Sequence, residues 1–240
     1  MGSGGVIVPP KGYIRRMWET CKANDILYVS DEVVTAFGRL GEWFASESVF
    51  GIQPDIITSA KGLTSGYQPL GATIFSDGIW DVISESGKGR YFAHGFTYSG
   101  HPVACRAALK NIEIIEDEKI LEHVREVGPY FQQQLETLLD LPIVGEVRGK
   151  NFMICIENVA NKETKELFPE ELDIGRWITD QAAKRGVLVR PIGHLNVLSP
   201  PVVLTKEQVD HIVATLRESI EAVMVELEQA GHWNNLAKSA

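Results

Sequence analysis

The chain contains short, continuous apolar runs that are rich in β-forming residues and end in polar or charged side chains. Three of them occupy residues 26–33 (ILYVSDEV), 55–60 (DIITSA) and 70–76 (LGATIFS), and a helix-like segment, residues 12–25, precedes them. Such runs are typical of strands buried in a mostly parallel sheet that helices cover. Functional side chains in these sheets gather just beyond the carboxyl ends of the strands. We therefore expect an α/β fold here, with Asp31 and Lys61 at two such ends.

The remaining sequence predicts a helical connection and a smaller α+β part. A loop rich in Gly and aromatic residues (87–102) leads to a helical pattern from Val103 to Leu139, with breaks near Asp117 and at Gly128-Pro129. Two strands over 141–158, a helix over 169–186 and strand-like segments over 187–193 and 196–203 follow, and a capping-box pattern, TKEQ at 205–208, opens the last helix. We expect domains at 1–105 and 141–240, joined by connecting helices at 106–140.

Charge and cysteine content limit the classes of partner. The 240 residues carry a net charge of -9, which disfavours nucleic acid because phosphates would be repelled. Three widely spaced cysteines without a CxxC pair indicate a reducing compartment, and no metal site is expected, since His94 and His101 do not have the spacing of zinc ligands. No apolar run is long enough for a membrane helix. A cytoplasmic protein that does not bind membranes is the simplest interpretation.

Lys61 has a possible chemical task at its strand end. An amine that is partly withdrawn from water is more readily neutral, and a neutral amine attacks carbonyl carbons and forms Schiff bases. Asp31 lies 30 residues earlier, about one strand–helix–strand step. A site for pyridoxal phosphate (PLP) needs a lysine for the aldehyde and an acid for the pyridine nitrogen. Taken alone, the pair also fits an exposed lysine and a turn-capping aspartate.

The amino-acid sequences of four segments strengthen the PLP interpretation. They read, in chain order, VSDEVVTAFGRLGEWFASE, QPDIITSAKGLTSGYQPLGA, HGFTYSGHPVACRAAL and GEVRGKNFM. Together they resemble the class III aminotransferases, the ω-amino acid and amine:pyruvate transaminases among the fold-type I PLP enzymes. The resemblance extends over essentially the whole chain. It implies that 1–105 is the C-terminal part of a PLP-binding large domain and that 141–240 is a small C-terminal domain.

The resemblance implies roles for five residues. Lys61 is similar to the lysine that binds the cofactor aldehyde and shuttles the proton, and Asp31 to the carboxylate that pairs with the pyridine nitrogen. Val33 is similar to the apolar residue packed on the ring, and Thr97 to the hydroxyl that reaches the cofactor phosphate of a neighbouring subunit, which implies a homodimer. Arg190 resembles the mobile arginine that receives a substrate carboxylate, a role that its planar fork suits.

Members of this family are usually nearly twice as long, so the resemblance also implies an incomplete chain. Met1 falls within what resembles the family's E-P-V/I-x-G-x-G-G loop. The N-terminal half would bring the phosphate loop, the stacking aromatic residue and much of the substrate pocket. We therefore expect weak cofactor binding and poor turnover. The alternatives are an inactive remnant that folds or dimerises, and another PLP reaction on the same scaffold, such as that of an aminomutase or a decarboxylase.

Overall fold

The computed structural model describes residues 2, 4–85, 89 and 92–233, and the chain divides into two units. The N-terminal unit is Pro9–Glu122, and the C-terminal unit joins Met1–Val8 to His123–Ala240. The division falls inside the stretch 106–140 that the sequence indicates as connecting helices. It places the first eight residues with the C-terminal unit, whereas the sequence analysis assigned them to 1–105.

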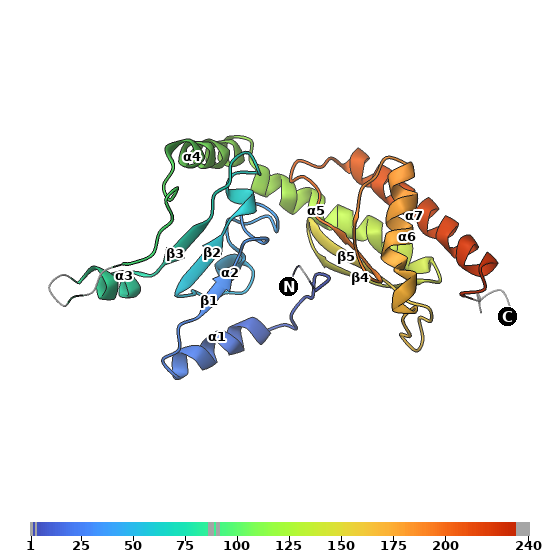
Figure 1. Ribbon diagram of the computed structural model, residues 1–240, viewed down its shortest axis with the longest axis horizontal. Coiled ribbons are helices and arrows are strands. Elements are labelled where there is room, and N and C mark those ends of the chain that lie inside the picture. Colours follow the sequence, from blue (N-terminus) through green and yellow to red (C-terminus); the bar gives the residue numbers. More distant parts are fainter. Residues whose placement is uncertain (1, 3, 86–88, 90–91, 234–240) are drawn as a thin grey trace. The chain divides into compact units, whose positions relative to one another are not determined.

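The N-terminal unit contains a three-stranded sheet in the order β1-β2-β3 (Figure 1). Strands β1 (Val29–Asp31) and β2 (Ile56–Ser59) are parallel, and β3 (Ala72–Phe75) is antiparallel to β2. The sheet formed by the described residues is therefore mixed, where a mostly parallel one was expected. The strands are shorter than the apolar runs that predicted them.

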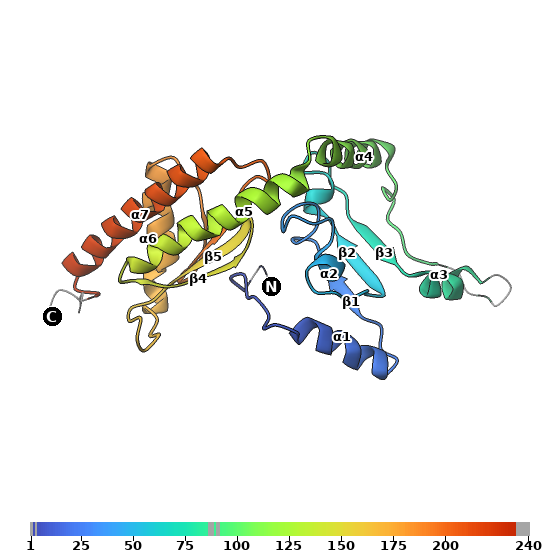
Figure 2. The ribbon, with the colours of Figure 1, turned by 180° about the vertical axis from the view of Figure 1, so that it is seen from behind.

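Four helices and a 3-10 turn accompany this sheet. They are α1 (Tyr13–Ala23), α2 (Ala45–Ser48), the 3-10 turn η1 (Lys61–Leu63), α3 (Asp77–Ser84) and α4 (Pro102–Asp117). Figures 1 and 2 show α1 and α4 on opposite sides of the sheet. An indole hydrogen bond of 2.9 Å from Trp18 to the carbonyl of Gln53 ties α1 to the segment before β2.

Much of the apolar surface of this unit is uncovered. In the part of the chain that the structure describes, no residue of α1 or α3 is buried, and Val29 of β1 is 53% exposed. Trp80 and Val82 of α3 are more than half exposed. Among the described residues, the largest fully buried side chains, which include Phe131, Phe152 and Leu216, belong to the C-terminal unit. The N-terminal unit thus presents apolar faces for which the described residues supply no cover.

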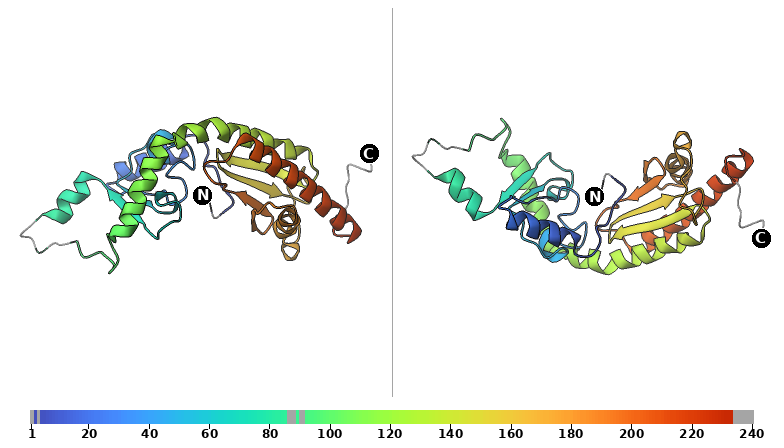
Figure 3. Two further views of the ribbon diagram at one scale, coloured as in Figure 1. Left: turned by 90° about the horizontal axis from the view of Figure 1, so that it is seen from above. Right: turned by 90° about the horizontal axis from the view of Figure 1, so that it is seen from below.

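The C-terminal unit is a helical layer on a four-stranded antiparallel sheet. The strands are β4 (Val144–Lys150), β5 (Met153–Asn158), β6 (Arg190–Ile192) and β7 (Leu195–Leu198), in the order β4-β5-β7-β6. Helices α5 (Ile120–Glu136, of which His123–Glu136 belong to this unit), α6 (Ile174–Lys184) and α7 (Lys206–Gln229) form the helical layer. In Figure 3, α5 and α7 run lengthwise and α6 is seen nearly end-on. The 3-10 turns η2 (Thr137–Asp140) and η3 (Glu170–Leu172) complete the unit.

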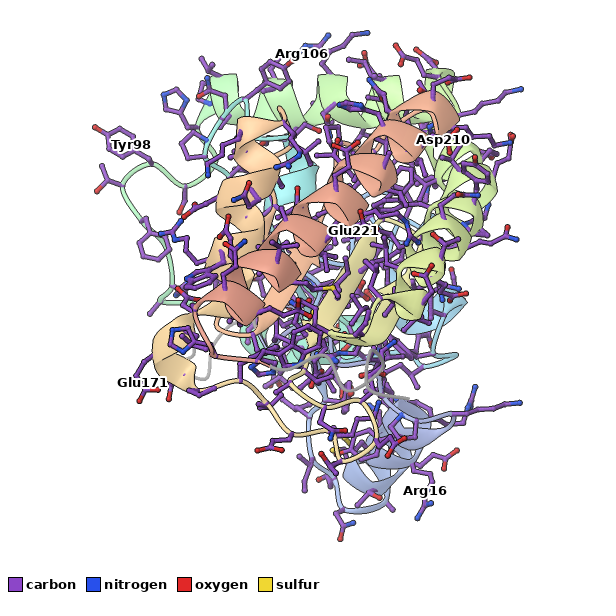
Figure 4. The ribbon with its side chains drawn as sticks, turned by 90° about the vertical axis from the view of Figure 1, so that its right-hand side faces the viewer. Arg16, Tyr98, Arg106, Glu171, Asp210 and Glu221 are labelled. Atoms are coloured by element: carbon purple, nitrogen blue, oxygen red, sulfur yellow. The ribbon has the colours of Figure 1, made fainter. Side chains whose placement is uncertain are left out.

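Helix α7 shows how sequence pattern becomes packing. The capping box is present, with the Thr205 hydroxyl accepting from the Gln208 amide and the Gln208 side chain accepting from the Thr205 amide. The apolar stripe from Val209 to Leu227 is buried, except for the half-buried Ile212. Exposed acids such as Asp210 and Glu221 lie along the same helix (Figure 4). The helix buries one face and solvates the other, as the spacing indicates.

Two predicted boundaries in this region were wrong. Helix α5 continues through Gly128-Pro129, where a break was expected. Gly128 is needed for packing, because a Cβ there would lie 2.7 Å from Asn151 Cα. The predicted helix over 169–186 starts instead at Ile174, since Asp173 has a left-handed backbone (φ 43°) that separates α6 from η3. None of the helices among the described residues has the length and apolar character that crossing a membrane requires.

Candidate active site

Lys61 and Asp31 lie at the carboxyl ends of neighbouring parallel strands. Asp31 is the last residue of β1 and pairs in register with Thr58 of β2, and Lys61 opens η1 three residues beyond Thr58. Both side chains are exposed. Parallel pairing brings the two strand ends to one edge of the sheet, as the sequence predicted. An amine and a carboxylate therefore extend from the same edge.

The surroundings of Lys61 differ from the partly buried setting that its position at a strand end suggested. Its residue is exposed, because neither the sheet edge nor η1 supplies a wall over it among the described residues. Its backbone is left-handed (φ 40°), a conformation that costs a residue with a Cβ about 1 kcal/mol or more. Contacts from the surrounding segments must therefore hold this turn.

Asp31 and Val33 belong to one turn at the end of β1. The Val33 amide donates to Asp31 Oδ1 over 3.0 Å, which fixes the direction of the carboxylate and leaves its other oxygen available. Val33 is half-buried in the turn that follows the strand. The turn thus sets an apolar side chain two residues from the carboxylate.

Glu32 is a residue of this region that the sequence analysis did not single out. It is 2% exposed, and its carboxylate accepts hydrogen bonds from the Ala45 amide (2.6 Å), the Ser46 amide (2.8 Å) and the Thr35 hydroxyl (3.0 Å). The Ser46 hydroxyl also donates to it. Glu32 therefore clamps residues 35–46 against the end of β1. Its place in VSDEV, one residue past Asp31 and so on the opposite face of the strand, was the available signal.

The clamped segment in turn contacts the Lys61 turn. Phe37, also left-handed (φ 54°), packs edge-on against Trp43 and Phe44. A Cβ on Gly62 would lie 2.9 Å from Phe37 Cβ and 3.3 Å from the carbonyl oxygen of Ala36. Gly62 is therefore required for this close approach. The Asp31 end and the Lys61 end of the sheet are joined by one continuous set of contacts.

Thr97 lies in the same unit, in a turn that ends at Gly100. The turn is closed by the Ser99 hydroxyl, which accepts from the Phe96 amide at 2.8 Å. Thr97 is exposed, and its neighbours Phe96 and Tyr98 are 76% and 79% exposed. Among the described residues, no hydrogen bond or ion pair joins Thr97 to Lys61 or Asp31. Such strong exposure of two aromatic side chains is unusual unless another surface covers them.

Arg190 belongs to the C-terminal unit. It opens β6, pairs in register with Val197 and is exposed. Among the described residues its guanidinium makes no ion pair.

A second charged cluster in the C-terminal unit is already paired. A pocket of about 480 Å³ is lined in part by Glu146, Arg148, Glu157 and His194. Arg148 pairs with both glutamates, and its Nε donates to the Gly5 carbonyl over 2.9 Å. Burial works against the charge of Arg148, but the hydrogen bonds to Glu157 and Glu146 raise its pKa above the usual value. The Arg148 guanidinium is therefore occupied by two carboxylates and by the backbone of Gly5.

The chain belongs to the class-III aminotransferase family. The family model described as "Aminotransferase class-III" matches residues 1–220, which confirms the resemblance found in the four segments. A probable gamma-aminobutyrate transaminase 3 of Oryza sativa subsp. indica is 43% identical over 92% of this chain and 44% of its own length. The putrescine–pyruvate aminotransferase of Pseudomonas aeruginosa is 42% identical over 92% of this chain and 47% of its own length.

Solved transaminases have the same fold. An amine transaminase from an uncultivated Pseudomonas species, crystallised in a PLP-bound form, is 43% identical and matches with a TM-score of 0.88. The match covers 92% of this chain and 50% of that one. The predicted fold class, part of a fold-type I large domain followed by a small α+β domain, is confirmed. The chain spans about half the length of the relatives it matches.

Proposed function

We propose that the protein acts as a PLP-dependent aminotransferase that moves an amino group from an amine or ω-amino acid to a keto acid such as pyruvate. One observation carries this proposal: in a chain of the class-III family, Lys61 and Asp31 extend from the ends of adjacent parallel strands. The names of the rice and Pseudomonas aeruginosa relatives support this substrate class. Its partners would then be small molecules, with neither nucleic acid nor membrane among them.

The residues present fit the two ends of the cofactor ring system. When bound, PLP supplies an aldehyde that combines with amines and a pyridine ring that withdraws electrons. Lys61 offers an exposed amine that would hold the aldehyde and later carry a proton to and from the substrate carbon. Asp31 has one carboxylate oxygen fixed by the Val33 amide, so the other would hold a proton at the pyridine nitrogen. Val33 would contact one face of the ring.

Thr97 and Arg190 would complete the site from other surfaces. We propose that Thr97 donates its hydroxyl to the phosphate bound by a second copy of the chain, in a homodimer. The exposed side chains of Phe96 and Tyr98 beside it support a covered position for this turn. Arg190 would pair with a substrate carboxylate, since its guanidinium is exposed and makes no ion pair among the described residues. The sparse, unpaired cysteines support a cytoplasmic location.

A second candidate is a fragment that folds or dimerises without turnover. The observation that favours it is the uncovered apolar surface of the N-terminal unit, with Val29, Trp80 and Val82 all more than half exposed. An aminomutase or decarboxylase on the same scaffold is a further alternative. All three enzymes would use Lys61, so chemistry at that residue separates them from the inactive fragment, and product analysis separates them from one another.

The decisive experiment measures PLP capture by Lys61. The 240-residue chain is incubated with PLP, reduced with borohydride and digested, and the pyridoxyl adduct is quantified on each lysine peptide. Lys119 is the internal reference, because it is also exposed and left-handed (φ 52°) but follows helix α4 instead of a strand. We expect the adduct to concentrate on Lys61 and to vanish in Lys61→Ala, with pyruvate-dependent consumption of an amine. Equal labelling of Lys61 and Lys119 would contradict the proposal.

A further inference from the structure

The side-chain amide of Asn111, in the middle of α4, forms hydrogen bonds with the segment that follows Lys61. Its Nδ2 donates to the carbonyl oxygens of Gly62 (2.8 Å) and Leu63 (3.2 Å), and its Oδ1 accepts from the Ser65 hydroxyl over 2.6 Å. Three hydrogen bonds thus connect one helical residue to residues 62–65. All the groups lie in the N-terminal unit, so their arrangement is internal to it.

These hydrogen bonds reach a turn that contains two unfavourable backbone conformations. Lys61 and Ser65 both have left-handed backbones, with φ of 40° and 49°, and neither is a glycine. Within residues 60–68, the Leu63 amide donates to Ala60 (2.9 Å), the Thr64 amide to Lys61 (3.2 Å) and the Tyr67 amide to Thr64 (3.0 Å), and the Thr64 hydroxyl donates to the Gln68 carbonyl (2.6 Å). These bonds are all local, and two unfavourable backbone conformations offset part of what they contribute. None of them connects the turn to another element of the unit, as the Asn111 bonds do.

The position of Asn111 on the helix fits an anchor better than a helix-stabilising role. Asparagine is a poor helix former, and α4 would be more stable with alanine at a mid-helix site. Asn111 continues the inward stripe of Ala104 and Ala108, where an apolar residue would be expected. A polar residue at that place is accounted for by the two carbonyl groups in front of it.

We infer that Asn111 is a positioning residue that holds the Lys61 turn in the left-handed form and so fixes the path of the lysine side chain. The inference rests on the proposed role of Lys61. Asn111 acts through the backbone of Gly62 and Leu63 and is not expected to touch cofactor or substrate. Loss of its donor group frees the turn to relax toward ordinary backbone angles. The Lys61 amine is then directed to the sheet edge for a smaller fraction of the time.

The first test measures the turn itself, without cofactor. Hydrogen exchange of a peptide covering residues 60–67 is compared between the natural chain, Asn111→Ala and Asn111→Asp. Loss of two hydrogen bonds should speed exchange of the Leu63 and Thr64 amides about tenfold in Asn111→Ala. Asn111→Asp, which turns a carboxylate toward two carbonyl oxygens, should do at least as much.

Two control variants separate the anchor from general damage. Glu113→Ala removes only the surface pairs of Glu113 with Lys110 and Arg106 on the same helix, so the 60–67 peptide should exchange as in the natural chain. Ser65→Ala removes one of the three bonds and should give a smaller effect than Asn111→Ala. Unchanged exchange in both Asn111 variants would overturn the inference.

The second test measures the consequence for Lys61. The ratio of the borohydride-fixed pyridoxyl adduct on Lys61 to that on Lys119 should fall several-fold in Asn111→Ala and stay unchanged in Glu113→Ala. The pH midpoint of the visible absorbance of bound PLP should shift in Asn111→Ala only. A preserved ratio and midpoint would refute the positioning role even if exchange rises. If the natural chain itself shows no preference for Lys61, the proposed function fails. The positioning role depends on that function and fails with it. Hydrogen exchange then reports only whether Asn111 anchors the turn.

Discussion

Replacing Glu32 by glutamine tests whether a buried carboxylate organises the Asp31 end of the site. Each carboxylate oxygen accepts one backbone amide and one hydroxyl: Oε2 serves Ala45 and Thr35, and Oε1 serves both groups of Ser46. Glutamine keeps one acceptor oxygen and presents an NH2 group in place of the other. The hydroxyl on that side can rotate to accept, but the backbone amide there cannot.

The size of the effect follows from this count. One buried backbone amide is left without an acceptor, which costs about 1–3 kcal/mol, and the remaining bonds lose the help of a charge. We therefore expect Glu32→Gln to lower the free energy of unfolding of the N-terminal unit by about 2–4 kcal/mol. The shape of the side chain is unchanged, so no cavity adds to this value.

Hydrogen exchange at increasing urea concentrations measures the loss in each unit separately. Peptides within residues 29–52 report on the clamped segment, and peptides within residues 209–227 of α7 report on the other unit. Glu47→Gln is the matched control, because Glu47 is exposed in α2 and should change stability by less than about 0.5 kcal/mol. If Glu32→Gln shifts the 29–52 peptides no more than Glu47→Gln does, the clamp has no energetic role.

Two further substitutions test packing and charge elsewhere. Gly128→Ala should lower the free energy of unfolding of the C-terminal unit by about 2 kcal/mol, since the new Cβ meets Asn151 Cα at 2.7 Å; urea titration would show no loss if α5 can move away. Burial opposes ionisation of Asp55, but hydrogen bonds from Lys22 and from the Tyr28 amide outweigh it and lower the pKa of Asp55 below its usual value. Its contribution to stability is therefore complete above the pKa of the unfolded chain and is lost as pH falls through the lowered pKa. Unfolding measured against pH should lose this acid-sensitive component in Asp55→Asn, and identical pH profiles would contradict the assignment.

The sequence predicted the element order well because each element carries its own periodic signal. The capping box of α7 and the two strands on either side of Asn151 are local patterns, and both are present as expected. The break predicted at Gly128-Pro129 was wrong, because the sequence pattern contains no information on Asn151, against which Gly128 packs. Tertiary contact overrode the local propensity.

The candidate site was predictable in part for the same reason. Lys61 and Asp31 could be found because a charged residue at the end of an apolar run is visible in the sequence. Glu32 and Asn111 could not be assigned roles, since their partners are distant in the sequence. Ala45 and Ser46 lie 13 or more residues from Glu32, and the partners of Asn111 in the Lys61 turn lie 46 or more residues from it. A polar residue within the inward stripe of α4 was the one available hint of Asn111.

These contacts separate two requirements of the proposed site that sequence resemblance treats as one. The direction of the Lys61 turn and of the Asp31 turn depends on Glu32, Gly62 and Asn111, all of which lie inside the N-terminal unit. The cover over the same edge does not come from the described residues, as the exposure of Lys61 shows. Geometry and enclosure can therefore fail independently. A chain with correctly directed side chains but an open edge would capture PLP selectively at Lys61 while water competes for every later proton transfer, so selective labelling with slow turnover is the expected behaviour of this arrangement.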